Sequence, residues 1–428
     1  MNLNQIQNVY FVGIGGIGMS ALARYFLNIG KNVAGYDKTK TQLTNELIAL
    51  GMDIHFEDNL SLVGEKYLDK TNTLVIITPA VPKDHSEWNY FLKEGFDVKK
   101  RAEVLGLITK DTFCFAVAGT HGKTTTSSIL GHILHQSGVD VTAFLGGIVE
   151  NYNSNISGDG KTVTVVEADE FDRSFLHLLP NLACITSMDA DHLDIYGDAS
   201  EIEKSFVDFS KKVKPGGKLF VRNGLPIQGI TYGIEDDSDY SVQNIKIENG
   251  TYVFDVKTPK TVLKNLQFNL PGRHNLSNAL IALAMAVEYG CPYRQLANAL
   301  ASFKGVKRRF TYQIKTEDFV FIDDYAHHPE EINAVHQAVR EMYPGKKVLA
   351  IFQPHLFSRT RDFIDEFAKS LSKFDEVLLL DIYPARELPI EGVTSSWLLG
   401  KINNKNKQLV NKKELITKIH DSNAQIIL

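Results

Sequence analysis

The first hundred residues alternate short runs of β-branched and aromatic residues with longer stretches in which apolar residues recur at helical spacing. The runs Asn8–Val12, Lys31–Tyr36 and Leu74–Ile77 predict buried strands. A helix is expected between the first two runs, from a glycine turn to about Leu27. Strands that alternate with helices in this way predict a parallel sheet covered by helices.

The same alternation recurs twice further along the chain. Its second cycle predicts strands at Phe113–Val117, Val163–Val166, Leu182–Thr186 and Lys218–Val221, and its third predicts strands at Phe319–Asp324, Lys347–Phe352 and Glu376–Asp381. Between these cycles, alternating runs such as Thr251–Val256 predict a small antiparallel unit at 230–270, and a helix is expected from about Asn275 to Glu288. The pattern therefore predicts an α/β fold of three domains, at residues 1–107, 108–303 and 304–428, the second with a mixed sheet.

The last residues, Ala424–Leu428, resemble the start of a buried strand with no turn or helix after it. In an α/β domain a central strand is normally followed by such elements. We therefore expect the third domain to be incomplete at this end of the sequence.

Composition narrows the class of protein. Of the 428 residues, 43% are hydrophobic and 23% are charged, which is ordinary for a globular protein and excludes disordered and fibrous classes. A formal net charge of −5 gives no reason to expect nucleic acid or an anionic membrane as a partner. The N-terminal residues lack the basic and apolar regions of a signal peptide, and no apolar run is long enough to span a membrane. Because Cys114, Cys184 and Cys291 are far apart and form no CxxC motif, we expect a reducing, cytoplasmic location.

A glycine-rich turn follows the first predicted strand. Gly13, Gly15, Gly16 and Gly18 stand between this strand and the next helix, where backbone amides can hold a phosphate group. Asp37, at the end of the second predicted strand, is placed to reach a ribose. Three interpretations stay open, namely NAD, another nucleotide or sugar nucleotide, and a tight turn without a ligand.

A second phosphate-binding loop follows the strand predicted at Phe113–Val117. It has the sequence Gly119-Thr120-His121-Gly122-Lys123-Thr124 and opens a helix. This is a variant of the P-loop, because Val117 stands where the strict pattern has its first glycine. In such a loop the amides surround phosphates, the lysine neutralises phosphate oxygens and the threonine hydroxyl binds Mg²⁺. The alternative is a chance match at the start of a helix.

Two phosphate-binding loops in one chain indicate two different phosphate-bearing ligands. An NAD dehydrogenase does not need a P-loop, and a P-loop ATPase does not need the first glycine turn. The combination therefore favours ATP together with a nucleotide-like substrate.

Acidic residues end two of the strands predicted in the second cycle. Glu167 opens the segment 167–172, and the segment 189–192 ends in His192. P-loop proteins hold their metal with a carboxylate at a neighbouring strand end, so Glu167 is a candidate Mg²⁺ ligand, and solvated strand ends are the alternative. His192 is a candidate ligand of a second Mg²⁺, which is unusual for this hard ion, or else a neutral hydrogen-bonding group. Further on, Asn275 is suited to cap a helix, and Asn278, one turn later, is a candidate to hydrogen-bond a base.

Polar side chains also gather after the strands of the third cycle, at the edge where α/β folds bind ligands. Two arginines after the second linker are candidates to stabilise phosphate charge, with a solvated patch as the alternative. An arginine after a later strand can hold a carboxylate bidentately. These third-domain candidates are Arg308, Arg309, Asp323, Asp324, His327, His355 and Arg359.

Taken together, these motifs resemble the Mur ligases, the ATP-dependent amide-forming enzymes of peptidoglycan precursor synthesis. The resemblance keeps its order along the whole chain and rests on the segments 13–23, 101–103, 118–126, 167–172, 189–197, 272–278, 305–310, 323–329, 353–362 and 381–387. The chain is most similar to the member of the family that uses L-alanine.

The resemblance implies Rossmann-like first and third domains around a central P-loop domain, and a role for each matching residue. It implies that UDP-sugar is held by Gly13, Gly15, Gly16, Gly18, Asp37 and Arg101. It implies that ATP is held by Gly119, Thr120, His121, Gly122, Lys123, Thr124, Thr125, Asn275, Asn278, Arg308, Asp323 and Asp324, and Mg²⁺ by Thr124, Glu167 and His192. The implied amino-acid pocket contains His327, His355 and Arg359, and the implied catalytic residues are Lys123, Glu167, His192, Arg308, Arg309, His327 and His355.

The implied reaction joins L-alanine to the lactyl carboxylate of UDP-N-acetylmuramate through an acyl phosphate and releases ADP and phosphate. The expected partners are small-molecule substrates alone, and the expected assembly is a monomer or a weak dimer. Two alternatives from the same family are a ligase that rejoins a murein tripeptide to the same sugar nucleotide and a non-catalytic nucleotide-binding relative. An NAD dehydrogenase is the remaining alternative, and it would need neither ATP nor Mg²⁺.

Overall fold

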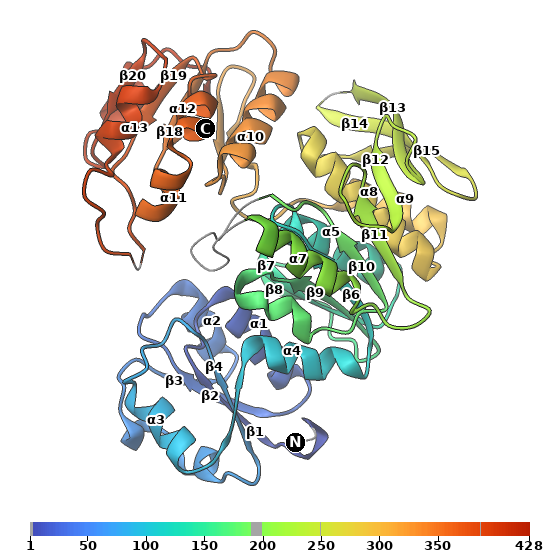
Figure 1. Cartoon of the computed structure of the whole chain (residues 1–428), viewed down its shortest axis with the longest axis vertical. Helices are drawn as coiled ribbons and strands as arrows, with labels where there is room; N and C mark the ends of the chain where they lie inside the picture. The colour runs from blue at the N-terminus through green and yellow to red at the C-terminus, as the bar shows by residue number, and fades with distance from the viewer. Residues whose placement is uncertain (1–2, 190–198, 249, 386) are drawn as a thin grey trace. The chain divides into compact units, whose positions relative to one another are not determined.

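The computed structural model describes residues 3–189, 199–248, 250–385 and 387–428 (Figure 1). Three sheets follow one another along the chain, with five, ten and six strands, and helices connect their parallel strands. The predicted α/β fold with three sheet-containing parts and a mixed central sheet is confirmed. By its internal contacts the chain forms two compact units, the first made of residues 1–245, 254–267 and 278–303, and the second of 246–253, 268–277 and 304–428.

The first sheet is wholly parallel, and its strand order β3-β2-β1-β4-β5 matches the first five strands of the 3-2-1-4-5-6 order of the dinucleotide-binding fold. Its strands are β1 (Asn8–Val12), β2 (Asn32–Tyr36), β3 (Asp53–His55), β4 (Thr73–Ile77) and β5 (Asp97–Lys100). Its helices are α1 (Ile17–Asn28), α2 (Gln42–Ala49), α3 (Ser86–Lys93) and α4 (Arg101–Lys110). All residues of β1 and β4 are buried, as expected for central strands of a parallel sheet that is covered on both faces.

The second sheet has the order β15-β14-β13-β12-β11-β10-β6-β9-β7-β8. Its strands are β6 (Phe113–Ala118), β7 (Val141–Val149), β8 (Ser154–Ser157), β9 (Val163–Ala168), β10 (Leu182–Ile185), β11 (Lys218–Arg222), β12 (Ile230–Ile234), β13 (Tyr240–Glu248), β14 (Thr251–Lys257) and β15 (Val262–Phe268). The associated helices are α5 (Lys123–Gln136), α7 (Ala199–Ser210), α8 (Arg273–Tyr289) and α9 (Tyr293–Ser302), with a 3₁₀ segment η4 at Phe171–His177.

The antiparallel unit predicted at 230–270 is wrong for its first strand pair, since β12 pairs with β13 in parallel. The alternation of apolar and polar residues tells which face of a strand is buried, and it carries no information on strand direction. The helix predicted to start near Asn275 begins at Arg273, so Asn275 lies inside the first helical turn and does not cap it.

The third sheet has the order β16-β17-β21-β18-β19-β20, and only the β16–β17 pair among the described strands of this sheet is antiparallel. Its strands are β16 (Thr311–Lys315), β17 (Val320–Asp323), β18 (Val348–Phe352), β19 (Glu376–Leu379), β20 (Lys407–Leu409) and β21 (Ile426–Ile427). Its helices are α10 (Pro329–Met342), α11 (Phe357–Asp362), α12 (Ile364–Leu371), α13 (Ser395–Lys401) and α14 (Leu415–Asp421). The buried strand expected at the end of the sequence is confirmed, because β21 lies between β17 and β18.

The hydrophobic core of the first compact unit is continuous across two sheets. Phe11 and Phe26 from the first sheet and its helix belong to the same buried cluster as Ala116 and Ile185 of the second sheet. The rings of Tyr25 in α1 and Phe144 in β7 lie 5.3 Å apart between centroids, which adds an aromatic contact to this junction. This shared core fixes the loops of the first sheet relative to those of the second.

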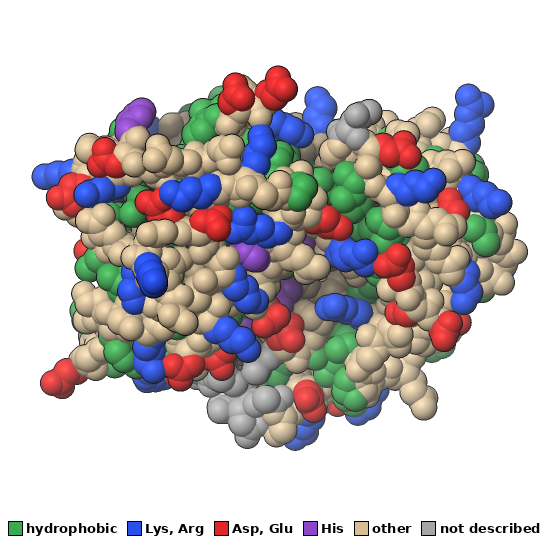
Figure 2. Space-filling view, turned by 90° about the horizontal axis from the view of Figure 1, so that it is seen from above, with side chains coloured by type: hydrophobic (Ala, Val, Ile, Leu, Met, Phe, Trp, Pro, Cys, Tyr) green, Lys and Arg blue, Asp and Glu red, His purple; other side chains and the backbone are tan. Residues whose placement is uncertain are grey.

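The described residues contain no helix with both the length and the apolar character needed to cross a membrane. On the face seen in Figure 2, basic and acidic side chains are interspersed and do not gather by sign. The mixture agrees with the small net charge of −5.

Candidate active site

The glycine turn after β1 is held by close contacts with its neighbours. Gly13 has a positive φ of 93°, and a Cβ atom at this position would collide with the side chain of Thr78. The amide of Gly15 donates a hydrogen bond of 2.6 Å to Oδ2 of Asp37. Asp37 therefore stabilises the turn through this hydrogen bond, and the ribose contact predicted for it is a separate role.

Arg101 lies directly beside this turn. It is the first residue of α4, and its guanidinium is so close to Gly18 that a Cβ there would lie 2.8 Å from Nη1. Its Nη2 also lies 3.6 Å from Oδ2 of Asp169, which follows β9 in the second sheet. The guanidinium thus stands where the glycine turn meets the second sheet, and its contact with a UDP-sugar stays a prediction.

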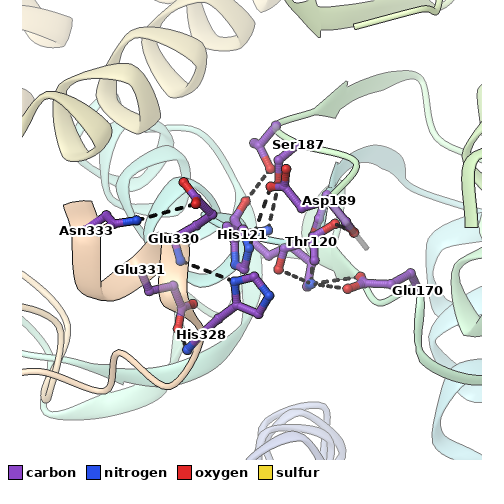
Figure 3. A network of polar contacts seen from close by, with 12 residues as sticks. Thr120, His121, Glu170, Ser187, Asp189, His328, Glu330, Glu331 and Asn333 are labelled. Carbon is purple, nitrogen blue, oxygen red and sulfur yellow. Dashed lines mark hydrogen bonds and ion pairs between the residues drawn. The ribbon is translucent and has the colours of Figure 1, made fainter. Parts of the chain in front are cut away.

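The P-loop connects β6 to α5 and is tied to the segment after β10. The hydroxyl of Thr120 donates to the carbonyl of Asp189 at 2.9 Å, and the amide of His121 donates to Oγ of Ser187 at 2.8 Å (Figure 3). His121 Nε2 lies 3.6 Å from Oδ2 of Asp189. Gly119 has a φ of 132°, and a Cβ on it would collide with Thr186.

The P-loop lysine is engaged by both the loop and an acidic residue. Nζ of Lys123 donates to the carbonyl of Gly119 at 2.7 Å and to Glu170 at 2.9 Å and 2.7 Å. Glu170 is only 2% exposed. Burial acts to lower the pKa of Lys123, but the charges of Glu170, Asp169 and Glu167 outweigh it, so the pKa is raised and the lysine is charged.

Glu167 and Thr124 lie together at the end of β9 and the start of α5. Oε2 of Glu167 accepts from the Thr124 hydroxyl at 3.1 Å, and Oε1 accepts from the hydroxyl of Ser127 at 3.1 Å and from the amide of Gly146 at 2.5 Å. A hydroxyl and a carboxylate are the hard oxygen ligands that Mg²⁺ prefers. These residues therefore fit the predicted metal, whereas His192 lies outside the described residues.

One cavity brings the two phosphate loops together. It has a volume of about 350 Å³ and lies within the first compact unit. Its lining includes Gly16, Gly18 and Arg101 from the first sheet and its helices, and Lys123, Thr124, Glu167 and Asp169 from the second. Two loops that are far apart in the sequence thus open on the same space.

The two asparagines predicted for ATP have different surroundings. Nδ2 of Asn275 donates to the carbonyl of Pro271 at 2.7 Å, which ties the start of α8 to the chain before it. Asn278 stands against the P-loop, since a Cβ on Gly122 would lie 2.6 Å from its Oδ1. Asn278 is thus next to the nucleotide loop, and Thr125 is buried in the first turn of α5.

In the second compact unit, the predicted arginines and acids lie around Tyr325. The guanidinium carbons of Arg308 and Arg309 are 5.0 Å and 5.7 Å from the centre of the Tyr325 ring. Arg308 is 3.8 Å from Asp323. Asp324 accepts from the amides of Phe310 and Ala326, both at 2.7 Å, and burial raises its pKa to about 6.

The predicted amino-acid pocket is assembled from three loops of this unit. The rings of His327 and His355 are 6.3 Å apart, and His355 stacks on Tyr383 with centroids 5.6 Å apart. Arg359 is buried in α11, close enough for its charge to act on His327. Burial lowers the pKa of His327, so the imidazole is neutral at pH 7. The three predicted pocket residues therefore share one neighbourhood.

Two residues that the sequence did not single out belong to these sites. Glu170 stands in an acidic segment of which the sequence singled out only Glu167, and its contact with Lys123 distinguishes it from the other acids. Tyr383 stands after β19 in the segment 381–387, and its place at a strand end was the one available signal.

The chain is similar to known protein families along its length. The family models described as Mur ligase family catalytic domain, Mur ligase middle domain, and Mur ligase glutamate ligase domain match residues 8–112, 117–286 and 308–426. The UDP-N-acetylmuramate–L-alanine ligase of Flavobacterium psychrophilum is 71% identical over 428 residues, which cover 100% of this chain and 95% of that protein. The protein of the same name from Cytophaga hutchinsonii is 48% identical and 94% covered.

Solved structures give the same result. The crystal structure of a UDP-N-acetylmuramate–alanine ligase from Thermotoga maritima matches with a TM-score of 0.82 and 28% identity, over 98% of this chain and 94% of that one. A murein peptide ligase from Psychrobacter arcticus has a TM-score of 0.71 and 23% identity, with 98% and 95% covered, and this likeness concerns the fold alone.

Proposed function

The chain belongs to the Mur ligase family, and we propose that it joins L-alanine to the lactyl carboxylate of UDP-N-acetylmuramate at the expense of ATP. The observation that carries this proposal is the cavity shared by the glycine turn with Arg101 and the P-loop with Lys123. A ligase must bring the carboxylate of one phosphate-bearing substrate to the γ-phosphate of another. A cavity with a phosphate loop from each of two sheets provides that arrangement.

The first step transfers a phosphoryl group. The lactyl carboxylate attacks the γ-phosphate of ATP, which gives an acyl phosphate and ADP. Lys123 neutralises the phosphate oxygens, and the P-loop amides orient them. Thr124 and Glu167 supply the oxygens that would hold Mg²⁺, which adds positive charge beside the phosphates when bound.

The second step forms the amide. The amine of L-alanine attacks the activated carbonyl, phosphate leaves, and the amine loses a proton. Arg359 holds the alanine carboxylate, and the rings of His327 and His355 border its side chain. Arg308 and Arg309 contribute positive charge toward the nucleotide, while Asp323 and Asp324 fix the loops that carry them. No residue of the chain has to act as a covalent nucleophile.

We place this activity in the cytoplasm, where ATP and a reducing environment are available. The proposed assembly is a monomer or a weak dimer, which light scattering after size exclusion measures directly.

The test is phosphate release from ATP with Mg²⁺ and UDP-N-acetylmuramate, with single additions of L-Ala, L-Ser, Gly, D-Glu or the murein tripeptide. We expect L-Ala to stimulate release, and Lys123→Ala to abolish it. Lys211→Ala is the matched control, because its side chain pairs with Asp208 on the surface and should leave the rate unchanged. Phosphate release stimulated by the tripeptide alone would assign the chain to the ligase that rejoins a murein tripeptide to the sugar nucleotide. No stimulation by any addition would indicate a non-catalytic binding protein.

A further inference from the structure

Two consecutive carboxylates each lie against a cation of a different phosphate loop. Asp169 stands 3.6 Å from the guanidinium of Arg101, beside the glycine turn. Glu170 contacts the ammonium of Lys123 through both of its oxygens, at 2.9 Å and 2.7 Å. Each cation that faces the shared cavity at a phosphate loop is thus paired with an acidic residue of one short segment.

The contact with Glu170 uses an N–H donor of Lys123 that a phosphate oxygen needs. A lysine ammonium has three N–H donors, and those of Lys123 are directed to the carbonyls of Gly119 and Thr120, at 2.7 Å and 3.3 Å, and to Glu170. A phosphate oxygen must displace one of these acceptors. Glu170 is the only anion among these three acceptors, and phosphate repels it more than it repels a neutral carbonyl. The carboxylate therefore competes with the nucleotide for Lys123.

The two carboxylates are also connected by one turn of backbone. Oδ1 of Asp169 accepts from the amide of Phe171 at 3.1 Å, and its carbonyl accepts from the amide of Phe175 at 2.9 Å. The carbonyl of Glu170 accepts from the amide of Arg173 at 2.9 Å within the same 3₁₀ segment. Because both residues belong to this turn, a movement of its backbone shifts both carboxylates.

We propose that Asp169 and Glu170 form a counter-ion pair that holds Arg101 and Lys123 in the phosphate-free protein and releases both when either phosphate-bearing substrate binds. Release by the first substrate prepares the loop for the second, so the two substrates bind cooperatively. Such coupling is reciprocal, with each substrate raising the affinity for the other by the same factor. The inference rests on the proposed function, because it needs both substrates at these loops. Asp169 and Glu170 are positioning residues that act through Arg101 and Lys123.

The test measures binding of the non-hydrolysable nucleotide AMP-PNP with Mg²⁺ by calorimetry, with and without UDP-N-acetylmuramate. For wild type we expect the sugar nucleotide to tighten nucleotide binding about fivefold or more. Glu170→Gln should bind the nucleotide alone about tenfold more tightly than wild type, since a charged competitor is removed. UDP-N-acetylmuramate should then not tighten the binding of AMP-PNP by this variant any further. In the kinetic assay this variant should lower the KM for ATP without raising kcat.

Asp169→Asn is the reciprocal variant. Its ion pair with Arg101 is longer and half-exposed, so we expect only a few-fold tighter binding of the sugar nucleotide and a loss of coupling. The matched control is Glu201→Gln, which removes an exposed carboxylate that pairs with Arg173, and it should change neither affinity.

Unchanged or weaker nucleotide binding by folded Glu170→Gln would overturn the proposal and leave Glu170 a structural residue. Should this variant fail to fold, Glu170→Asp is the second variant. It keeps the negative charge on a shorter side chain, which moves the carboxylate away from Lys123. Tighter nucleotide binding by Glu170→Asp then supports the pair, and unchanged binding refutes it. If wild type binds no nucleotide at all, the proposed function itself fails and the counter-ion pair falls with it.

Discussion

The buried histidine of the P-loop helix makes the stability of the first compact unit sensitive to acid. His132 in α5 is 2% exposed, with Nδ1 2.6 Å from the hydroxyl of Tyr152 and Nε2 3.0 Å from Oγ of Ser302. Burial, followed by the charge of His135, lowers its pKa from 6.5 to about 4. The imidazole is therefore neutral in the folded protein at pH 7.

The sign of the effect follows from which state binds the proton. Well above pH 6.5 neither the folded nor the unfolded state protonates His132, and the group adds no pH dependence. Below that value the unfolded chain takes up the proton and the folded protein does not, so stability falls until the folded pKa of about 4 is reached. Between pH 7 and pH 5 the loss amounts to about 2 kcal/mol of the free energy of unfolding.

His132→Gln isolates the contribution of this histidine to the pH dependence of stability. Glutamine is neutral at all pH values, and its amide keeps one of the two hydrogen bonds. At pH 7 we expect the substitution to lower the free energy of unfolding by about 1–2 kcal/mol, because one buried hydrogen-bond partner is left unsatisfied. Between pH 7 and pH 5 the variant should lose about 2 kcal/mol less than wild type.

Urea unfolding followed by circular dichroism at both pH values measures the difference, and comparison at each pH cancels the other titrating groups. His420→Gln, at an exposed site in α14, is the control and should follow wild type. Equal pH dependence in wild type and His132→Gln would refute the reasoning, because the proton linkage would then lie elsewhere.

Three further predictions concern the site. Glu167→Gln removes the carboxylate that accepts from Thr124 and Gly146, and we expect the Mg²⁺ concentration for half-maximal phosphate release to rise about tenfold, as a metal titration would show. Gly119→Ala places a Cβ against Thr186 at a φ of 132°, so the P-loop must shift, and calorimetry should detect a nucleotide affinity at least about tenfold weaker. Arg359→Lys replaces a planar fork by a point charge, and the KM for L-alanine should rise about tenfold while nucleotide affinity stays at the wild-type value.

The local elements of this fold could be predicted from the sequence wherever burial on both faces produces an uninterrupted apolar run. β1, β4 and β6 are such strands, and the glycine turn and P-loop follow two of them directly. Sheet order could not be predicted in this way. β21, for example, lies between β17 and β18 although about a hundred residues separate it from β17, and no local pattern encodes such an insertion.

Some residues of the candidate site could likewise be predicted from the sequence, and others could not. Lys123 and Thr124 stand in a motif whose spacing alone predicts their chemistry. Glu170 could not be distinguished from the other acids of its segment, because the sequence does not tell which carboxylate turns inward. The ligand contacts of Asp37 and Asn275 stay predictions, and the structure adds a hydrogen bond of each residue to the chain itself.

The small net charge of the chain is compatible with its proposed affinity for two polyanions, because cations of the proposed site are paired with carboxylates. In the first compact unit Lys123 and Arg101 face Glu170 and Asp169, and in the second unit Arg308 stands 3.8 Å from Asp323. Cations that are paired with carboxylates produce little long-range field, so a site of this kind needs no excess of basic residues in the composition. Phosphates then bind by exchanging partners with the carboxylates. A site of this kind discriminates by geometry, since only an anion that reaches each cation at its loop can replace the acid that holds it.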